Sequence, residues 1–233
     1  MHRVEHIMGM PIVVAARGGD VPDEVFDWFR HVDEMFSTFK EESEVSRVRR
    51  GELALEDASL KVQHVFARCE ELRTETHGFF DVEAVGFDPS GFVKGWSVDE
   101  ATAILDRAGV EEYAINAGGD IRVRGHWTIG IQHPRDANAI AKVVEGSDLA
   151  VATSGAYERG EHVRDPHTGA APDGILSVTV TGPDLGTADA YATAAFAMGA
   201  RRAPGWTARL RGYEAMTILA DGRVLSTPGF PSA

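Results

Sequence analysis

Residues 175–199 read ILSVTVTGPDLGTADAYATAAFAMG, and this stretch is the best guide to the fold. The part from Ile175 to Thr181 is rich in β-branched residues, which is typical of a strand. Small residues fill the part from Thr187 to Met198, which predicts a helix that Gly199 ends. A strand followed closely by a helix indicates that the chain mixes the two kinds of element.

The sequence before this stretch contributes further helices. Apolar side chains recur on one helical face over residues 22–36 and again over residues 59–75, and each pattern predicts a helix. A third helix is expected to begin at Ser97, because Ser97 and Glu100 have the spacing of a capping box. Gly109 is expected to end it.

Strands and loops complete the pattern. Short strands are predicted at residues 3–16, 113–116, 127–132, 140–144, 148–153, 214–220 and 223–226. Residues 77–95 and 153–174 lack a clean period, and we interpret them as functional loops. No internal repeat and no shift of composition marks a linker. We therefore expect a single α+β domain, of mixed α/β content, over residues 1–233.

Composition and charge exclude several classes of protein. The 233 residues include 23 Lys and Arg against 36 Asp and Glu, a formal net charge of −13. Such a charge repels nucleic acid and anionic membranes, so we expect neither as a partner. No stretch of 18 apolar residues predicts a membrane span. The first residues resemble no export signal, so the expected compartment is the cytoplasm.

Common catalytic motifs are missing from the sequence. It has no GxxxxGK[ST] phosphate loop, no GxGxxG after a strand, no HExxH and no GxSxG. The absence of these motifs argues against an ordinary NTPase, dinucleotide dehydrogenase, zinc protease or α/β-hydrolase. The lone cysteine, Cys69, lies on the apolar face of a predicted helix, so we interpret it as a core residue.

Asp189 and Thr193 are four residues apart in the predicted helix, so their oxygens lie on one face. A carboxylate and a hydroxyl suit a hard cation such as Mg²⁺, with phosphate and water oxygens as its other ligands. An acidic protein that binds a phosphate ligand needs such local compensation. The alternative is a helix-end cap followed by a core threonine.

Three more motifs lie in predicted loops and turns. Residues 162–169, HVRDPHTG, combine turn chemistry with a histidine that is either a general acid or base or incidental. Lys94, just before the helix expected at Ser97, is either an anion-binding cation or a solvated one. Gly118 and Gly119 either let the backbone approach a ligand closely or form a turn or bulge.

Taken in order, these motifs resemble those of the ApbE family, the FAD:protein FMN transferases. The resemblance runs from about Met8 to Gly199. Its most specific parts are Asp165-Pro166-x-Thr168-Gly169 and Ala188-Asp189-Ala190-x-x-Thr193. The other parts are FSTF at 36–39, SEVSR at 43–47, the Lys94-Gly95 segment with Asp99, NAGGD at 116–120, and TSG at 153–155 with Tyr157 and Arg159.

The resemblance implies a single α/β unit with a central, tunnel-like FAD site. It implies that FAD is the substrate and that its FMN half is attached, through phosphate, to a Thr or Ser hydroxyl of an acceptor flavoprotein while AMP leaves. Mg²⁺ is the implied cofactor, with Mn²⁺ left open as a substitute. Some family members instead hydrolyse FAD to FMN and AMP.

The resemblance also implies roles for individual residues. Asp189, Thr193 and the backbone carbonyl of Gly91 are the expected Mg²⁺ ligands, and His162 is the expected general base or phosphate contact. The residues expected to contact FAD are Met8, Phe39, Gly78, Phe79, Phe80, Asp81, Asp88, Lys94, Gly118, Gly119, Asp120, Thr153, Ser154 and Gly155.

The sequence departs from the family pattern in a few places. Met10 stands where the family usually has Thr, and Phe39 replaces a common Tyr, which keeps the stacking face and loses the hydroxyl. The connection between Asp81 and Asp88 is short. Two alternatives to the transferase remain: an FAD pyrophosphatase, whose acceptor is water, and an FAD-binding protein without catalysis.

Overall fold

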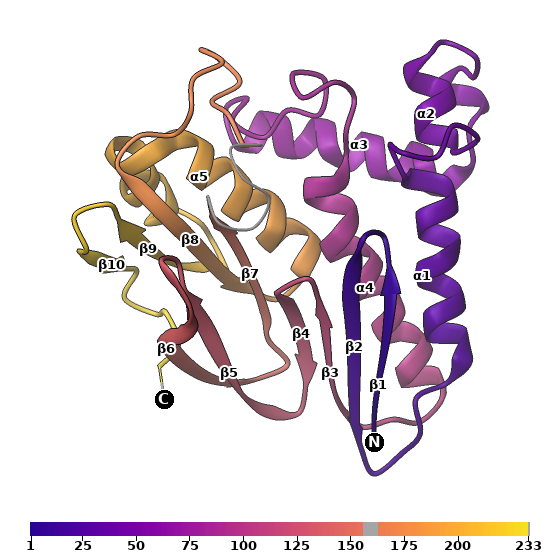
Figure 1. Cartoon of the computed structure of the whole chain (residues 1–233), viewed down its shortest axis with the longest axis horizontal. Coiled ribbons are helices and arrows are strands. Elements are labelled where there is room, and N and C mark those ends of the chain that lie inside the picture. Colours follow the sequence, from indigo (N-terminus) through magenta and orange to yellow (C-terminus); the bar gives the residue numbers. More distant parts are fainter. Residues whose placement is uncertain (156–162, 233) are drawn as a thin grey trace.

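The computed structural model describes residues 1–155 and 163–232 (Figure 1). Its helices are α1 (Asp23–Phe36), α2 (Glu44–Arg49), α3 (Leu60–Glu75), α4 (Ser90–Arg107) and α5 (Leu185–Thr207), with a short 3₁₀ turn at Leu55–Asp57. Its strands are β1 (His2–Ile7), β2 (Met10–Arg17), β3 (Glu112–Ala117), β4 (Asp120–Arg124), β5 (His126–His133), β6 (Asp136–Ser147), β7 (Ala150–Gly155), β8 (Ile175–Gly182), β9 (Glu214–Leu219) and β10 (Val224–Ser226). The mixed α and β class predicted from the sequence is confirmed.

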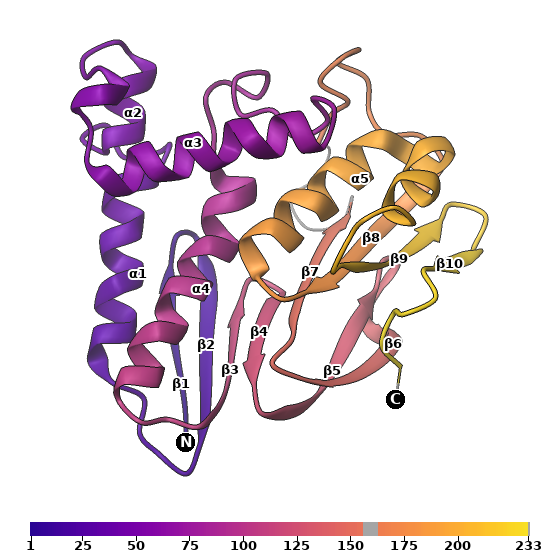
Figure 2. The same ribbon diagram turned by 180° about the vertical axis from the view of Figure 1, so that it is seen from behind.

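An eight-stranded antiparallel sheet forms the centre of the fold. Its strand order is β1-β2-β3-β4-β7-β8-β9-β10, and the β5–β6 hairpin is a separate two-stranded sheet. The helices α1, α4 and α5 lie on one face of the large sheet, as both views show (Figures 1 and 2). The sheet therefore separates a helical layer from the hairpin.

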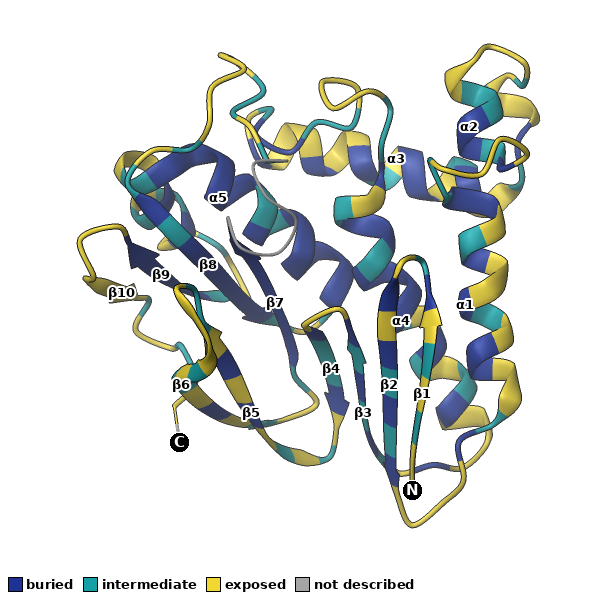
Figure 3. Cartoon of the chain, viewed as in Figure 1, coloured by how far each residue is buried: buried dark blue, intermediate teal, exposed yellow. Residues whose placement is uncertain are grey.

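Alternation along the strands explains why both faces of the sheet are covered. On β7, Ala150 and Ala152 join the core beneath the helices, whereas Val151 joins a second apolar cluster with Ile129 and Val144 of the hairpin. Successive side chains of a strand point to opposite faces. Figure 3 shows the resulting band of buried residues across the middle strands.

The helix expected to start at Ser97 begins seven residues earlier, so that prediction was wrong. Ser90 opens α4, and the Asp88 carboxylate accepts a hydrogen bond at 2.9 Å from its backbone N–H. Ser97 lies buried inside the helix, where its hydroxyl donates to the carbonyl of Lys94 at 2.7 Å. Lys94 is consequently a helical residue and does not precede a helix.

The other helix predictions are largely confirmed. The helix α3 begins after Ser59, whose hydroxyl accepts from the N–H of Val62, and Gly109 follows the end of α4 with φ of +76°. Gly199 also breaks the helical backbone, with φ of 68°, but the chain then continues α5 as a second helical segment. The elements α2 and β4 lie where no element was predicted.

Cys69 is 1% exposed on the inner face of α3. Burial raises the pKa of its thiol to about 12. This burial confirms the prediction of a core cysteine. A thiol held neutral in an apolar environment is also a poor nucleophile. In the parts of the chain that the structure describes, no helix has the length and apolar character needed to cross a membrane.

Candidate functional site

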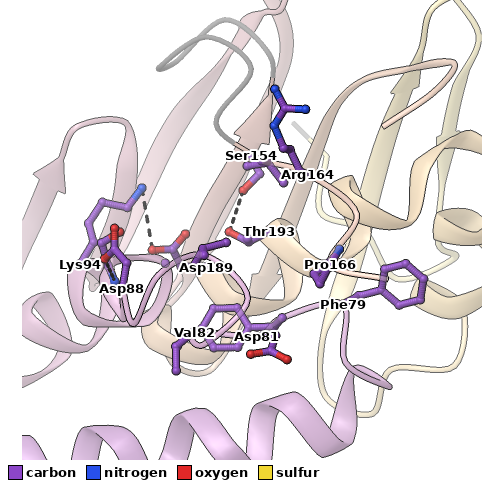
Figure 4. A pocket seen from close by; sticks show the side chains of 15 residues that line it. Phe79, Asp81, Val82, Asp88, Lys94, Ser154, Arg164, Pro166, Asp189 and Thr193 are labelled. Atoms are coloured by element: carbon purple, nitrogen blue, oxygen red, sulfur yellow. Dashed lines mark hydrogen bonds and ion pairs between the residues drawn. The ribbon is translucent and has the colours of Figure 1, made fainter. Parts of the chain in front are cut away.

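A pocket of about 310 Å³ opens between α5, the first turns of α4 and the loops on either side of them (Figure 4). It brings together segments that are far apart in the sequence. Its lining residues are Phe79, Phe80, Asp81, Val82, Val85, Asp88, Ser90, Gly91, Lys94, Ser154, Val163, Arg164, Pro166, Asp189 and Thr193. Nine of the residues predicted to bind FAD or metal are in this set.

Helix α5 supplies a carboxylate and a hydroxyl to the pocket. Asp189 and Thr193 are one helical turn apart, and both line the pocket. The Asp189 side chain is 3% exposed, and the Thr193 hydroxyl lies 3.2 Å from the hydroxyl of Ser154 on β7. A carboxylate and two hydroxyls therefore converge at the junction of α5 and the sheet.

Gly91 brings the backbone of α4 up to these oxygens. A Cβ atom at this position would lie 3.2 Å from the ring of Phe80 and 3.6 Å from Oγ1 of Thr193. A larger side chain would press on the Phe80 ring and fill the space beside the Thr193 hydroxyl. The glycine thus keeps the first turn of α4 close to α5 within the pocket.

Lys94 places a positive charge beside the same oxygens. Its ammonium lies 2.7 Å from Oδ2 of Asp120 and 3.8 Å from Oδ2 of Asp189. Asp120 is 0% exposed, and its other oxygen accepts a hydrogen bond at 3.1 Å from the backbone N–H of Thr153. Asp120 is not among the described residues that line the pocket, and its carboxylate contacts Lys94, which does line it.

The oxygen donors fit a magnesium ion that binds mainly through a substrate. Among the residues that the structure describes, no three His, Cys, Asp or Glu side chains gather as a metal site. Asp189 is nonetheless a buried carboxylate facing the pocket, with the Thr193 hydroxyl beside it. Mg²⁺ accepts such sparse protein ligation when phosphate and water oxygens complete its octahedron.

The structure leaves some predicted FAD contacts outside this pocket. Gly118, Gly119 and Thr153 line a neighbouring pocket of about 620 Å³ beside β5. Phe39 is 95% exposed in the turn before α2. The predicted contacts that line neither pocket are Met8, Phe39, Gly78, Asp120 and Gly155. His162, Tyr157 and Arg159 lie outside the described residues.

The sequence analysis missed one charged residue of the pocket. Arg164 lines it, and the Arg164 guanidinium donates to the carbonyl of Gly169 at 3.1 Å. The Asp-Pro turn of the same motif is present, with the Asp165 carboxylate accepting from the N–H of His167 at 2.9 Å. Arg164 stands between the histidine and that turn, so the motif itself contained the signal.

The turn after Asp165 also joins two loops of the pocket. The His167 ring contacts the ring of Phe79 edge-on, with centroids 4.7 Å apart. Nε2 of His167 lies 3.1 Å from the carbonyl oxygen of His77. A Cβ atom on Gly78 would lie 3.0 Å from the His167 ring, and φ of Gly78 is +79°. Gly78 therefore supports the site by its backbone shape and by this close approach.

Comparison with known proteins gives a consistent family. The ApbE family model matches residues 8–86 and 82–217. The FAD:protein FMN transferase of Vibrio cholerae is 32% identical over 163 residues, covering 63% of this chain and 49% of the relative. That of Rhodobacter capsulatus is 31% identical over 158 residues, covering 62% and 30%. The chain thus spans half or less of the length of these relatives.

Solved structures show the same fold. The flavin transferase ApbE from Vibrio cholerae superimposes with a TM-score of 0.86 at 24% identity, covering 99% of this chain and 97% of the other. The ApbE protein from Thermotoga maritima gives 0.86 at 21% identity, with the same coverage. Fold, motif order and the match of the family model agree, and the chain belongs to the ApbE family.

Proposed function

We propose that this protein transfers the FMN half of FAD to a Thr or Ser hydroxyl of an acceptor flavoprotein, releases AMP and depends on Mg²⁺. The observation that carries the proposal is the convergence of Asp189, Thr193 and the Gly91 backbone on one pocket beside Lys94. The names of the relatives, FAD:protein FMN transferase, agree with it.

The pocket offers different walls to the two chemical parts of FAD. Phe79, Phe80, Val82 and Val85 line it and give an apolar surface for a ring system. Lys94 and Arg164 also line the pocket, and their positive charges attract the pyrophosphate. A protein of net charge −13 needs such local positive charge to bind an anionic ligand. We take this pocket as the place of the FAD tunnel implied by the family.

Asp189, Thr193 and the carbonyl of Gly91 are the residues that would hold Mg²⁺, and Mn²⁺ has the same preference for oxygen ligands. When bound, the ion neutralises charge on the pyrophosphate and on the departing AMP. The role of the protein is then mostly to position the reacting groups, as in other phosphoryl transfers.

The chemical step needs a base for the acceptor hydroxyl. We assign this role to His162, which lies outside the described residues, because its neighbour Val163 lines the pocket. His162 accepts the hydroxyl proton while the hydroxyl oxygen forms a bond to the phosphorus of the FMN half. The bond from that phosphorus to the bridging oxygen breaks, and AMP leaves with the electron pair.

One incubation separates the candidate functions. The protein is mixed with FAD, a peptide containing Thr and Ser, and Mg²⁺ or EDTA, and mass spectrometry follows AMP, free FMN and the peptide. We expect peptide carrying FMN and an equal amount of AMP, and neither in EDTA. AMP with only free FMN would indicate an FAD pyrophosphatase. Bound FAD without AMP would indicate a binding protein and would contradict the role of His162.

A charge-removing variant tests the metal ligand. Asp189→Asn keeps the size of the side chain and removes its charge, and we expect AMP release to fall at least about 100-fold. The control is Asp27→Asn on α1, an aspartate whose side chain is 68% exposed. Equal rates for Asp189→Asn and the control, with both proteins folded by circular dichroism, would contradict the proposed metal site.

A further inference from the structure

Three charged side chains lie in a row at the wall of the pocket. The Lys94 ammonium stands between the carboxylates of Asp120 and Asp189, at 2.7 Å from the first and 3.8 Å from the second. The Lys94 side chain is 14% exposed, that of Asp120 is 0% exposed and that of Asp189 is 3% exposed. Two buried carboxylates therefore share one cation unequally.

Asp120 is held in place by the sheet. It is the first residue of β4, where it pairs with Ala117 across the hairpin. Its Oδ1 accepts from the backbone N–H of Thr153, which fixes the carboxylate against β7 and leaves Oδ2 facing Lys94. The Coulomb attraction at 2.7 Å is about 1.4 times that at 3.8 Å, and only the shorter distance lies within hydrogen-bond range, so Lys94 is held more strongly by Asp120 than by Asp189.

We propose that Asp120 is a positioning residue that anchors Lys94 and so keeps the Lys94 ammonium from closing on Asp189. This inference rests on the proposed function, in which Asp189 binds the divalent cation. A lysine paired closely with Asp189 would compete with that cation for the same carboxylate. The fixed anchor in β4 thus preserves both a metal-binding carboxylate and a cation for the substrate phosphates.

A purely structural ion pair would not need this arrangement. Asp120 has no surface in the pocket, whereas Lys94 and Asp189 both line it. The negative charge of Asp120 consequently acts on the pocket through the position of Lys94. If Asp120 acts through Lys94, the effect of replacing Asp120 on metal binding should vanish when the lysine is removed. If Asp120 instead acts by holding strand β7, the effect should persist without the lysine.

The first test is Asp120→Asn. The amide keeps an oxygen that accepts from the Thr153 N–H and removes the charge that holds Lys94. We measure the Mg²⁺ concentration for half-maximal AMP release, and the dissociation constant of FAD by flavin fluorescence in EDTA and in Mg²⁺. We expect the half-saturating Mg²⁺ concentration to rise about tenfold, as for the loss of other residues that orient metal ligands. The tightening of FAD binding by Mg²⁺ should shrink in parallel.

The control for a surface charge is Asp33→Asn. Asp33 pairs with Lys40 at 2.5 Å on the surface, where the Lys40 side chain is 47% exposed. It resembles Asp120 in being an aspartate bound to one lysine, but neither Asp33 nor Lys40 lines the pocket. The Mg²⁺ requirement should stay within twofold of the wild type.

A double-mutant comparison then separates the two explanations. In the Lys94→Met background, adding Asp120→Asn should change the half-saturating Mg²⁺ concentration less than twofold. A tenfold shift that persists without the lysine would overturn the proposal, because Asp120 would then act through the strand or its own field. An unchanged Mg²⁺ requirement in Asp120→Asn alone would overturn it as well.

A crystal structure of Asp120→Asn keeps the proposal open to refutation if Lys94→Met does not fold. We expect the Lys94 ammonium within about 3 Å of Asp189; an ammonium still nearer to residue 120 would contradict us.

Failure of the proposed function is seen in the wild type. FAD that binds tighter with Mg²⁺ but gives no AMP refutes the transferase and leaves this inference measurable by binding. A wild type that binds FAD equally well with and without Mg²⁺ and also releases no AMP refutes both.

Discussion

The carboxylate of Asp99, on α4, accepts a hydrogen bond at 2.8 Å from the backbone N–H of Leu185, the first residue of α5. It accepts a second at 2.9 Å from the N–H of Gly186. The first N–H groups of a helix have no partner within the helix. A side chain from one helix therefore caps another, and the capped helix carries Asp189 one turn later.

Protonation of Asp99 should make stability depend on pH. Burial raises the pKa of Asp99 to about 7, against the opposing effects of the two N–H donors and of Arg122. The folded protein then holds this proton more tightly than the unfolded chain, where an aspartate has a pKa of about 3.9. The contribution of Asp99 to stability is complete below about pH 4 and is lost as the pH rises through about 7.

The measurement compares the wild type with Asp99→Asn in urea at pH 5 and pH 7. The free energy of unfolding of the wild type, relative to the variant, should fall by about 2 kcal/mol between these values. The variant has the same titrating groups apart from Asp99, so their effects cancel in the difference. A difference that is flat, or that grows with pH, would contradict the raised pKa.

The close crossing of α4 and α5 predicts a steric effect at Gly95. A Cβ atom there would overlap the carbonyl oxygen of Leu185 and lie 2.8 Å from Cα of Gly186. Both are backbone atoms that cannot move without shifting α5. We expect Gly95→Ala to lower the free energy of unfolding by about 1–3 kcal/mol, as overpacked cores do.

The matched control for this prediction is Gly205→Ala, in the second segment of α5. Among the described residues, and apart from its neighbours in the same helix, no atom lies within 4 Å of the position of its Cβ, so the methyl group meets open space. We expect a gain of about 0.5–1 kcal/mol, because alanine loses less backbone freedom than glycine in a helix. Urea titration checks both variants, and equal signs of the two changes would show that the helix crossing does not set the cost.

Lys94→Met should be costly for stability as well as for substrate binding. It leaves the carboxylate of Asp120, which is 0% exposed, without the ammonium at 2.7 Å. Removing one partner of a buried ion pair typically costs about 3–5 kcal/mol. Adding Asp120→Asn removes the stranded charge and should restore most of the loss. Urea titration of both proteins tests this, and a double variant no more stable than Lys94→Met would refute the explanation.

The sequence predicted the long elements that carry a local pattern and missed the short elements α2 and β4. The one-sided apolar periods of residues 22–36 and 59–75 correspond to α1 and α3. The strand β4 is short and depends on its pairing with β3 and β7, which no local pattern specifies. The apparent capping box formed by Ser97 and Glu100 failed because α4 already begins at Ser90, so Ser97 lies inside the helix. The earlier start was missed because residues 90–95 show no clean apolar period.

The candidate site shows the same division. Asp189 and Thr193 were found because a four-residue step in a helix fixes their common face. The link between Lys94 and Asp120 joins residues of α4 and β4, and only the fold brings them to 2.7 Å. For the same reason, Gly118 and Gly119 were grouped with Asp120 by sequence, although they line a different pocket from Lys94.

Substitution of Phe39 can distinguish a role of its ring in ligand binding from a role in packing. Its ring is 95% exposed, so Phe39→Ala should change the free energy of unfolding by less than about 0.5 kcal/mol. The family resemblance predicts that this ring stacks on the flavin. Loss of one aromatic contact of about 0.5–1.5 kcal/mol would weaken FAD binding roughly two- to tenfold.

Urea titration and flavin fluorescence measure the two effects of Phe39→Ala on the same protein. The control is Phe39→Tyr, which keeps the stacking face and should bind FAD within twofold of the wild type. Another comparison is Phe29→Ala, whose ring is 0% exposed on α1 and whose loss should cost about 3–5 kcal/mol of stability. Unchanged FAD affinity in Phe39→Ala would remove Phe39 from the site. Weaker FAD binding at unchanged stability would indicate direct contact with the flavin, because the exposed ring has no packing role through which to act.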